Sequence, residues 1–190
     1  GTPASEASVA LGLKWLAAHQ ETSGCWDMAT YSKGCPSGDP CGNSHVKNGG
    51  VFAPGVTGLA LLAFLGAGDT PYEGKHREVV EKAALWLERC QDKAGLFGSR
   101  SQDGMMYNQA IATLALAELY GMTADEKAGA AAQRGIRFIE RAQQEGGGWD
   151  YGTERTGRSD TSVTGWQVMA LKSAQAAGLK VSPQVWFKAM

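Results

Sequence analysis

The sequence predicts an all-α chain of three repeated helix pairs followed by the start of a seventh helix. Two observations carry this prediction. A pattern of six positions recurs three times with every internal offset unchanged. Apolar segments of helical periodicity, bounded by Gly and Pro, alternate with the copies of this pattern. A fixed repeat combined with helical periodicity is the signature of stacked helical units.

Each copy contains a small, an aromatic and an aliphatic residue, followed by Gln, Gly and a second aromatic residue. The copies are Gly12, Trp15, Leu16, Gln20, Gly24 and Trp26; Ala83, Trp86, Leu87, Gln91, Gly95 and Phe97; and Gly135, Phe138, Ile139, Gln143, Gly147 and Trp149. The first three positions lie 8, 5 and 4 residues before the glutamine, on one face of an α-helix. The glutamine therefore falls at a helix end, where backbone carbonyls lack partners. Its amide can donate to one carbonyl and accept from a neighbouring N–H. We expect a structural staple between two helices rather than a reactive site.

Each predicted helix has its own start and stop signals. The helices are expected at about residues 5–20, 56–66, 72–91, 107–121, 123–143 and 161–178, with a seventh opened by Ser182 and Pro183. Thr123 and Glu126 have the spacing of a capping box, which predicts the start of the fifth helix. Glycines follow most of the predicted helix ends, as is typical of helix termination.

Two kinds of helix alternate, which predicts an arc with two layers. Helices that are apolar around most of their circumference form the inner layer, and helices with charged residues on one side form the outer layer. One domain spanning 1–190 then contains repeats at about 5–70, 71–122 and 123–180. The glutamines are separated by 91−20 = 71 and 143−91 = 52 residues. The longer first interval indicates an insertion between Trp26 and Val56.

The repeated pattern resembles the glutamine–tryptophan repeat of the terpene (squalene) cyclase and protein prenyltransferase superfamily. The first and third copies match it closely, whereas the second has Phe97 in place of Trp. The resemblance covers nearly the whole chain and implies an α/α toroid, which about six hairpins close into a ring. Three hairpins make about half a ring, so we expect a fragment. A second copy, forming a homodimer, or the missing remainder of the toroid would complete it.

Composition excludes several classes of partner. The 190 residues are 43% hydrophobic and 19% charged with a net charge of −1, which is typical of a globular domain. A charge near zero argues against nucleic acid as a partner. No apolar run approaches the roughly 18 residues of a membrane span, so we expect no transmembrane segment.

Asp160 directly precedes the third inner helix. Its context resembles the acidic DxDD-T motif that supplies the proton in squalene-hopene-type cyclases. Asp160 and Thr161 match the last two positions, but Gly157 and Ser159 replace the other two acids. The resemblance makes Asp160 the candidate catalytic acid. The residues themselves favour an ionised N-cap that accepts from the amides two and three positions later.

The insertion is rich in cysteine. Ligands of the types found in a Cys₃His zinc site are Cys25, Cys35, Cys41 and His45. Their spacing lacks the C-x₂-C pair that makes zinc sites recognisable. We therefore favour a Cys35–Cys41 disulfide, with zinc or unpaired thiols as alternatives and no other cofactor. A disulfide favours an extracytoplasmic location. His19 and His76 fall in predicted helices and are expected to be solvated, with His19 assisting the adjacent staple.

Polar and aromatic residues near the starts of the inner helices are the remaining functional signal. The candidate ligand-lining residues are Tyr107, Asn108, Gln109, Trp166 and Gln167. Few of them are aromatic, whereas a cyclase stabilises carbocations with aromatic faces. We expect a non-catalytic module that binds a peptide, glycan or hydrophobic ligand on its concave face. An isoprenoid cyclase-like enzyme using Asp160 is the alternative, and ordinary helix packing is the structural interpretation of the same residues.

Overall fold

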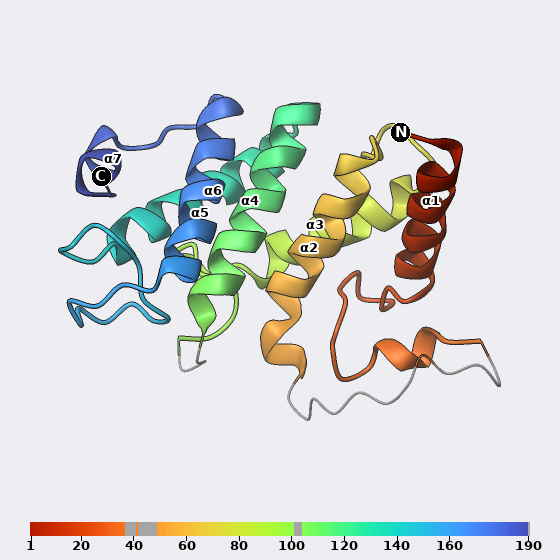
Figure 1. Cartoon of the computed structure of the whole chain (residues 1–190), viewed down its shortest axis with the longest axis horizontal. Coiled ribbons are helices and arrows are strands. Elements are labelled where there is room, and N and C mark those ends of the chain that lie inside the picture. Colours follow the sequence, from red (N-terminus) through yellow and green to blue (C-terminus); the bar gives the residue numbers. More distant parts are fainter. Residues whose placement is uncertain (37–40, 42–48, 101–103, 190) are drawn as a thin grey trace.

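The computed structural model describes residues 1–36, 41, 49–100 and 104–189, and these residues form an all-α fold (Figure 1). The α-helices are α1 (Pro3–Ala18), α2 (Ala53–Gly66), α3 (Arg77–Cys90), α4 (Met105–Thr123), α5 (Glu126–Ala142), α6 (Thr161–Ala176) and α7 (Pro183–Ala189). Two short 3₁₀ helices, η1 (Tyr31–Gly34) and η2 (Gly49–Phe52), lie between α1 and α2. In Figure 1 the helices follow one another from α1 at one end to α7 at the other. The predicted helical class is confirmed.

The centre of the core is α4, which is buried around most of its circumference. It packs against α2 on one side and α6 on the other, while α5 lies against it from outside. Helix α3 packs on α2 in the same way, whereas α3 and α4 make little contact although they are consecutive. The most extensive packing joins the apolar helices α2 and α6 to the apolar helix α4, and α3 and α5 each pack on the apolar helix that precedes them.

The three repeated glutamines each join their own turn to a later helix. Gln20 Nε2 donates to the carbonyls of Gly24 (2.9 Å) and Val79 (2.9 Å). Gln91 Nε2 donates to the carbonyls of Gly95 (3.3 Å) and Ala131 (3.0 Å). Gln143 Nε2 donates to the carbonyls of Gly147 (2.7 Å) and Val185 (2.9 Å). The second carbonyl lies in α3, α5 and α7, respectively. The amide group thus donates twice, where we expected one donated and one accepted hydrogen bond.

The aromatic residue that follows each glutamine is buried, and it connects α1, α3 or α5, the expected outer helices, to α2, α4 or α6, the expected inner helices. The backbone N–H groups of Trp26, Phe97 and Trp149 donate to the side chains of Thr57 (3.1 Å), Gln109 (3.0 Å) and Thr164 (3.0 Å). These acceptors lie near the starts of α2, α4 and α6. Both tryptophans also donate their indole N–H to a carbonyl near the end of the preceding outer helix, at 2.8 Å in each case.

Glycine is required in the turn between these two residues because the turn lies directly on the next outer helix. Gly24 and Gly95 have φ angles of +104° and +93°, which L-residues rarely adopt. A Cβ atom at either position would lie 2.3 Å from a backbone carbonyl oxygen, that of Lys82 or Arg134. The pattern of Gln, Gly and aromatic residue is therefore one structural unit.

Helix α3 begins later than the sequence suggested. We expected its start at residue 72 or 73, but the helix begins at Arg77. The carboxylate of Asp69 accepts hydrogen bonds from the backbone N–H groups of Lys75 (2.7 Å) and His76 (3.3 Å). These bonds hold the segment before Arg77 as a loop, because they occupy amides that an earlier helix start would use.

The start of α5 is also capped differently. The predicted capping box of Thr123 and Glu126 is not formed, and Asp125 is the N-cap. Its carboxylate accepts from the backbone N–H groups of Lys127 (3.0 Å) and Ala128 (2.9 Å). Asp125, two residues after the predicted Thr, supplies the same kind of cap. Helix α7 begins at Pro183, as predicted.

One stretch of the described chain, Gly49–Gly66, is long and apolar enough to cross a membrane by length and composition alone. This corrects the expectation that no run approaches that length. The stretch contains α2, which packs against α3 and α4, and just over half of it is buried. A core helix passes the same test, so there is no clear transmembrane segment.

Replacing Gln143 by Ala should destabilise the fold. The substitution leaves carbonyls in the third turn and in α7 without their donor, which costs about 1–3 kcal/mol. The matched control is Gln175→Ala, because Gln175 is exposed on α6. Urea unfolding followed by circular dichroism measures both free energies. Equal unfolding free energies for the two variants would contradict the staple.

Candidate functional site

Asp160 is the N-cap of α6. One carboxylate oxygen accepts from the backbone N–H groups of Ser162 (2.9 Å) and Val163 (3.0 Å), and the other accepts from the hydroxyl of Tyr151 (3.1 Å). The hydroxyl of Ser162 and these further donors hold the pKa of Asp160 below its ordinary value. Within the described part of the chain, its hydrogen-bond partners are hydroxyls and amides. An ionised cap cannot supply a proton to an alkene, so the geometry does not support the catalytic-acid assignment.

Two tyrosines adjoin this cap. The bond from Tyr151 to the charged Asp160 raises the pKa of Tyr151 to about 12. The ring of Tyr107 lies 5.9 Å from that of Tyr151, and its hydroxyl is 2.6 Å from Ser162 Oγ. Tyr107, a predicted lining residue, therefore belongs to a surface cluster at the starts of α4 and α6.

The predicted lining amides serve helix packing instead. Asn108, Gln109 and Gln167 are at most 3% exposed. Their backbone partners are Val51 and Gly55 for Asn108, Gly95, Phe97 and Gly135 for Gln109, and Met106 for Gln167. Buried amides with such partners cannot contact a ligand, which corrects their assignment. Trp166 remains half-buried.

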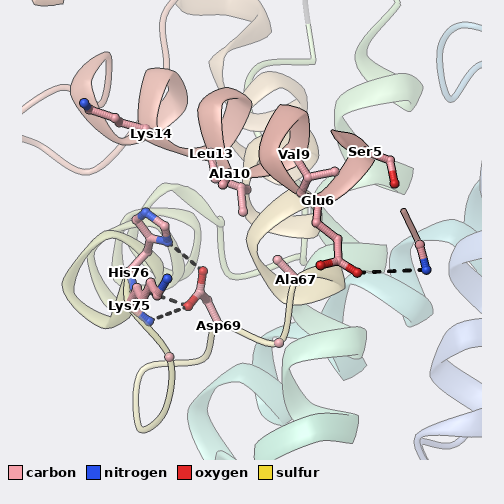
Figure 2. Close-up of a pocket in the computed structure, with 13 residues that line it drawn as sticks. Ser5, Glu6, Val9, Ala10, Leu13, Lys14, Ala67, Asp69, Lys75 and His76 are labelled. Carbon is pink, nitrogen blue, oxygen red and sulfur yellow. Dashed lines mark hydrogen bonds and ion pairs between the residues drawn. The ribbon is translucent and has the colours of Figure 1, made fainter. Parts of the chain in front are cut away.

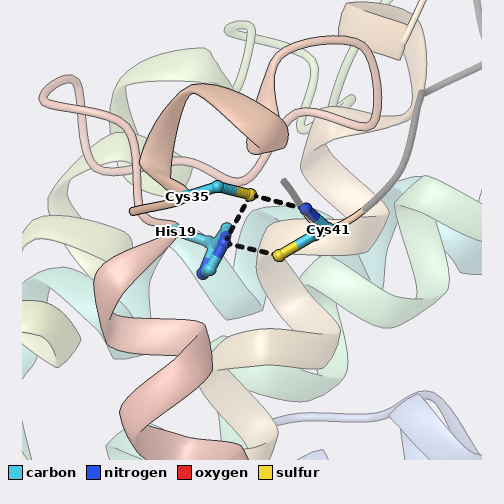
Figure 3. Close-up of side chains that lie close together, drawn as sticks. All are labelled: His19, Cys35 and Cys41. Atoms are coloured by element: carbon cyan, nitrogen blue, oxygen red, sulfur yellow. Dashed lines mark hydrogen bonds between the residues drawn. The ribbon is translucent and has the colours of Figure 1, made fainter. Parts of the chain in front are cut away.

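Cys35 and Cys41 lie close together without forming the predicted disulfide. The imidazole Nε2 of His19 lies 3.4 Å from Cys35 Sγ and 3.2 Å from Cys41 Sγ (Figure 3). All three atoms lie within 4.8 Å of one another. Each sulfur therefore contacts the imidazole, where a disulfide requires the sulfurs to be about 2.05 Å apart.

The structure also differs from the alternative zinc ligand set of Cys25, Cys35, Cys41 and His45. Cys25 is buried away from this cluster, with its Sγ 3.3 Å from Ser23 Oγ, and burial raises its pKa. His45 lies outside the described residues. His19 was expected to be solvated, yet it is 4% exposed and joins Cys35 and Cys41. Its position at the end of the helix that enters the cysteine-rich loop was the signal that could have identified it.

A cavity of about 780 Å³ lies between α1, the end of α2 and the loop before α3. Val9, Ala10 and Leu13 face it from α1, and Ala67, Asp69 and His76 lie on the opposite side (Figure 2). Its volume is within the range of about 300–1,000 Å³ that is common for ligand pockets. Sequence reasoning missed the cavity because its walls come from distant segments.

Asp69 and His76 form a structural pair in the cavity wall. His76 Nδ1 lies 2.7 Å from Asp69 Oδ2, so His76 is not simply solvated as we expected. Burial acts to raise the pKa of Asp69, but the hydrogen bonds from His76 and Lys75 outweigh burial and lower it. The ionised carboxylate thus holds the loop before α3.

The exposed face of α1 differs from the equivalent faces of α3 and α5. Val9 is 56% exposed, whereas Val80 and Ala132, at the same repeat position, are 0% exposed. Nothing lies within 4 Å of a Cβ atom built on Gly12, but one built on Gly135 would lie 2.3 Å from a threonine oxygen of α4. Among the described residues, α1 therefore lacks the apolar helix that covers its counterparts.

Comparison with protein-family models, curated proteins and solved structures finds no match to this chain. The resemblance to the squalene cyclase and prenyltransferase repeat therefore rests on the recurring motif alone.

Proposed function

We propose that this chain is a non-catalytic helical-repeat module, an arc of an α/α toroid of the squalene cyclase and prenyltransferase type, that binds an apolar α-helix on α1. The arc is supported by the glutamine hydrogen bonds that recur between one outer helix and the next. Gln143 contacts Val185 of α7 as Gln91 contacts Ala131 of α5, so α7 takes the place of a further outer helix. The ionised, capping state of Asp160 supports a role without catalysis.

The observation that carries the proposal is the uncovered face of α1. Helix α2 packs against α3 and α4 packs against α5, whereas the described chain places no such helix before α1. Val9 and Gly12 are exposed there although their counterparts are buried. The cavity beside Val9 and Leu13 extends this surface. A helical peptide fits it better than a glycan does, because the repeat already packs helices on this face.

A second copy of the chain is the source of such a helix that the molecule itself offers. Helix α6 is an apolar helix at the opposite end from α1 (Figure 1), and its Met169 is 51% exposed. Phe187 of the adjoining α7 is 77% exposed. Exposed apolar residues at both ends favour association of two arcs. The remainder of a toroid would also supply an apolar helix to pack on α1.

A synthetic peptide with the sequence 105–123, which forms α4, should bind the chain. Because α4 covers α5 in the equivalent place, the peptide should cover Val9. Val9→Lys should weaken binding about tenfold, since burying a valine contributes about 1.5 kcal/mol or more. Leu11→Lys is the control, because Leu11 is 68% exposed on α1 and does not line the cavity. Fluorescence anisotropy of the labelled peptide measures both affinities.

Equal weakening by the two lysine substitutions, or no binding at all, would contradict the proposed face. Turnover of squalene that is lost in Asp160→Asn would contradict the non-catalytic role.

The chain should also self-associate at micromolar concentration. Light scattering should give about twice the mass of one 20.0 kDa chain, because the apolar end surfaces cover each other in the dimer. Val9→Lys should shift the mass toward that of one chain, and Leu11→Lys should leave the dimer intact. A wild-type mass of one chain would exclude the second copy as the partner and leave the remainder of a toroid.

A further inference from the structure

We propose that His19, Cys35 and Cys41 bind one Zn²⁺ ion. The site is independent of the helix-binding face and differs from the ligand set that the cysteine spacing suggested. It provides one imidazole nitrogen and two thiol sulfurs, which are donor types that zinc prefers. Both sulfurs contact the imidazole Nε2 of His19.

The two distances from the His19 nitrogen to the sulfurs are close to those of a tetrahedral zinc site. With Zn–S of about 2.3 Å and Zn–N of about 2.0–2.1 Å, tetrahedral ligand atoms lie about 3.5–3.8 Å apart. His19 Nε2 is 3.4 Å from Cys35 Sγ and 3.2 Å from Cys41 Sγ. Both distances from the nitrogen are within a few tenths of an ångström of the tetrahedral values, and all three donor atoms lie within 4.8 Å of one another.

The imidazole is oriented with its lone pair toward the sulfurs. His19 Nδ1 lies 2.6 Å from the carbonyl oxygen of Trp15. Because a carbonyl only accepts, Nδ1 carries the proton and Nε2 presents a lone pair. Metal-binding histidines are commonly held in this way by a carbonyl on the other ring nitrogen. The indole ring of Trp15 stacks on the imidazole at 4.0 Å and restricts its rotation.

Each sulfur also receives an N–H donor. The backbone N–H of Cys41 donates to Cys35 Sγ at 3.1 Å, and the indole N–H of Trp15 donates to Cys41 Sγ at 3.2 Å. Such donors stabilise a negatively charged sulfur and fix its direction. The two thiolates would neutralise the ion. Trp15 thus supports both His19 and Cys41 and is a positioning residue of the site.

The ion would join two segments of the chain. His19 is 4% exposed and precedes the staple Gln20, whereas Cys41 is exposed and leaves the site accessible from solvent. Zinc would tie the end of α1 to the segment after η1, and a water molecule can take the fourth position. This connection would fix the inserted loop beside the first staple.

Zinc titration of the fully reduced protein against a chromophoric chelator tests the site. We expect one Zn²⁺ per chain, and Co²⁺ should give the visible absorption of a tetrahedral thiolate site. Cys35→Ser and Cys41→Ser should each lower the zinc affinity at least about tenfold. Cys90→Ser is the control, because that thiol lies in α3 and donates to the carbonyl of Leu87. Unchanged affinity in both site variants would overturn the proposal.

Alkylation followed by mass spectrometry gives a second readout that does not depend on the variants folding well. Bound Zn²⁺ should slow modification of Cys35 and Cys41 in the wild-type chain and leave Cys25 and Cys90 unchanged. Zinc added before exposure to air should also prevent the two-hydrogen mass loss of a Cys35–Cys41 disulfide. Equal alkylation with and without zinc, or a disulfide that forms equally fast in its presence, would overturn the site.

Discussion

The hydrogen bonds of one glutamine amide at the end of each outer helix are the interaction on which the rest of the structure depends. A helix end leaves carbonyls without donors, and each amide group serves one carbonyl in its own turn and one in a later helix. The same geometry connects α1 to α3, α3 to α5 and α5 to α7. It fixes successive outer helices relative to one another, so that α2, α4 and α6 pack as successive neighbours in the core.

Most of the carboxylates and amides that could have been catalytic or ligand-binding groups instead form hydrogen bonds that stabilise this helix arrangement. The carboxylates of Asp69, Asp125 and Asp160 accept backbone N–H groups, and the buried amides of Asn108 and Gln109 connect helices to turns. An ionised carboxylate that is satisfied by several donors is a poor proton source. Two features are not explained by this arrangement: the exposed apolar face of α1 and the cluster of two thiols with an imidazole. The proposed helix binding and the proposed zinc site rest on these two features.

Structural features that depend on residues close together in the sequence could be predicted from it. The staple at Gln143 and the cap at Asp160 depend on residues within a few positions, so their spacing was informative. The role of His19 had only the indirect signal of its place beside the cysteine-rich loop, because its partners lie 16 and 22 residues away in an insertion that the other copies lack. The burial of Asn108 depends on packing between helices that no local pattern encodes. The late start of α3 was also not predicted, because the hydrogen bonds from the Asp69 carboxylate to the amides before Arg77 span six and seven residues.

Exchange of the glutamine side-chain amide protons with solvent, followed by nuclear magnetic resonance, tests the central claim most directly. The amide protons of Gln20, Gln91 and Gln143 donate to backbone carbonyls, whereas the side chain of Gln175 is exposed. The account predicts that the three repeated glutamines exchange at least about tenfold more slowly than Gln175, because protection requires the hydrogen bonds to open. Exchange of all four side chains at the same rate would contradict it.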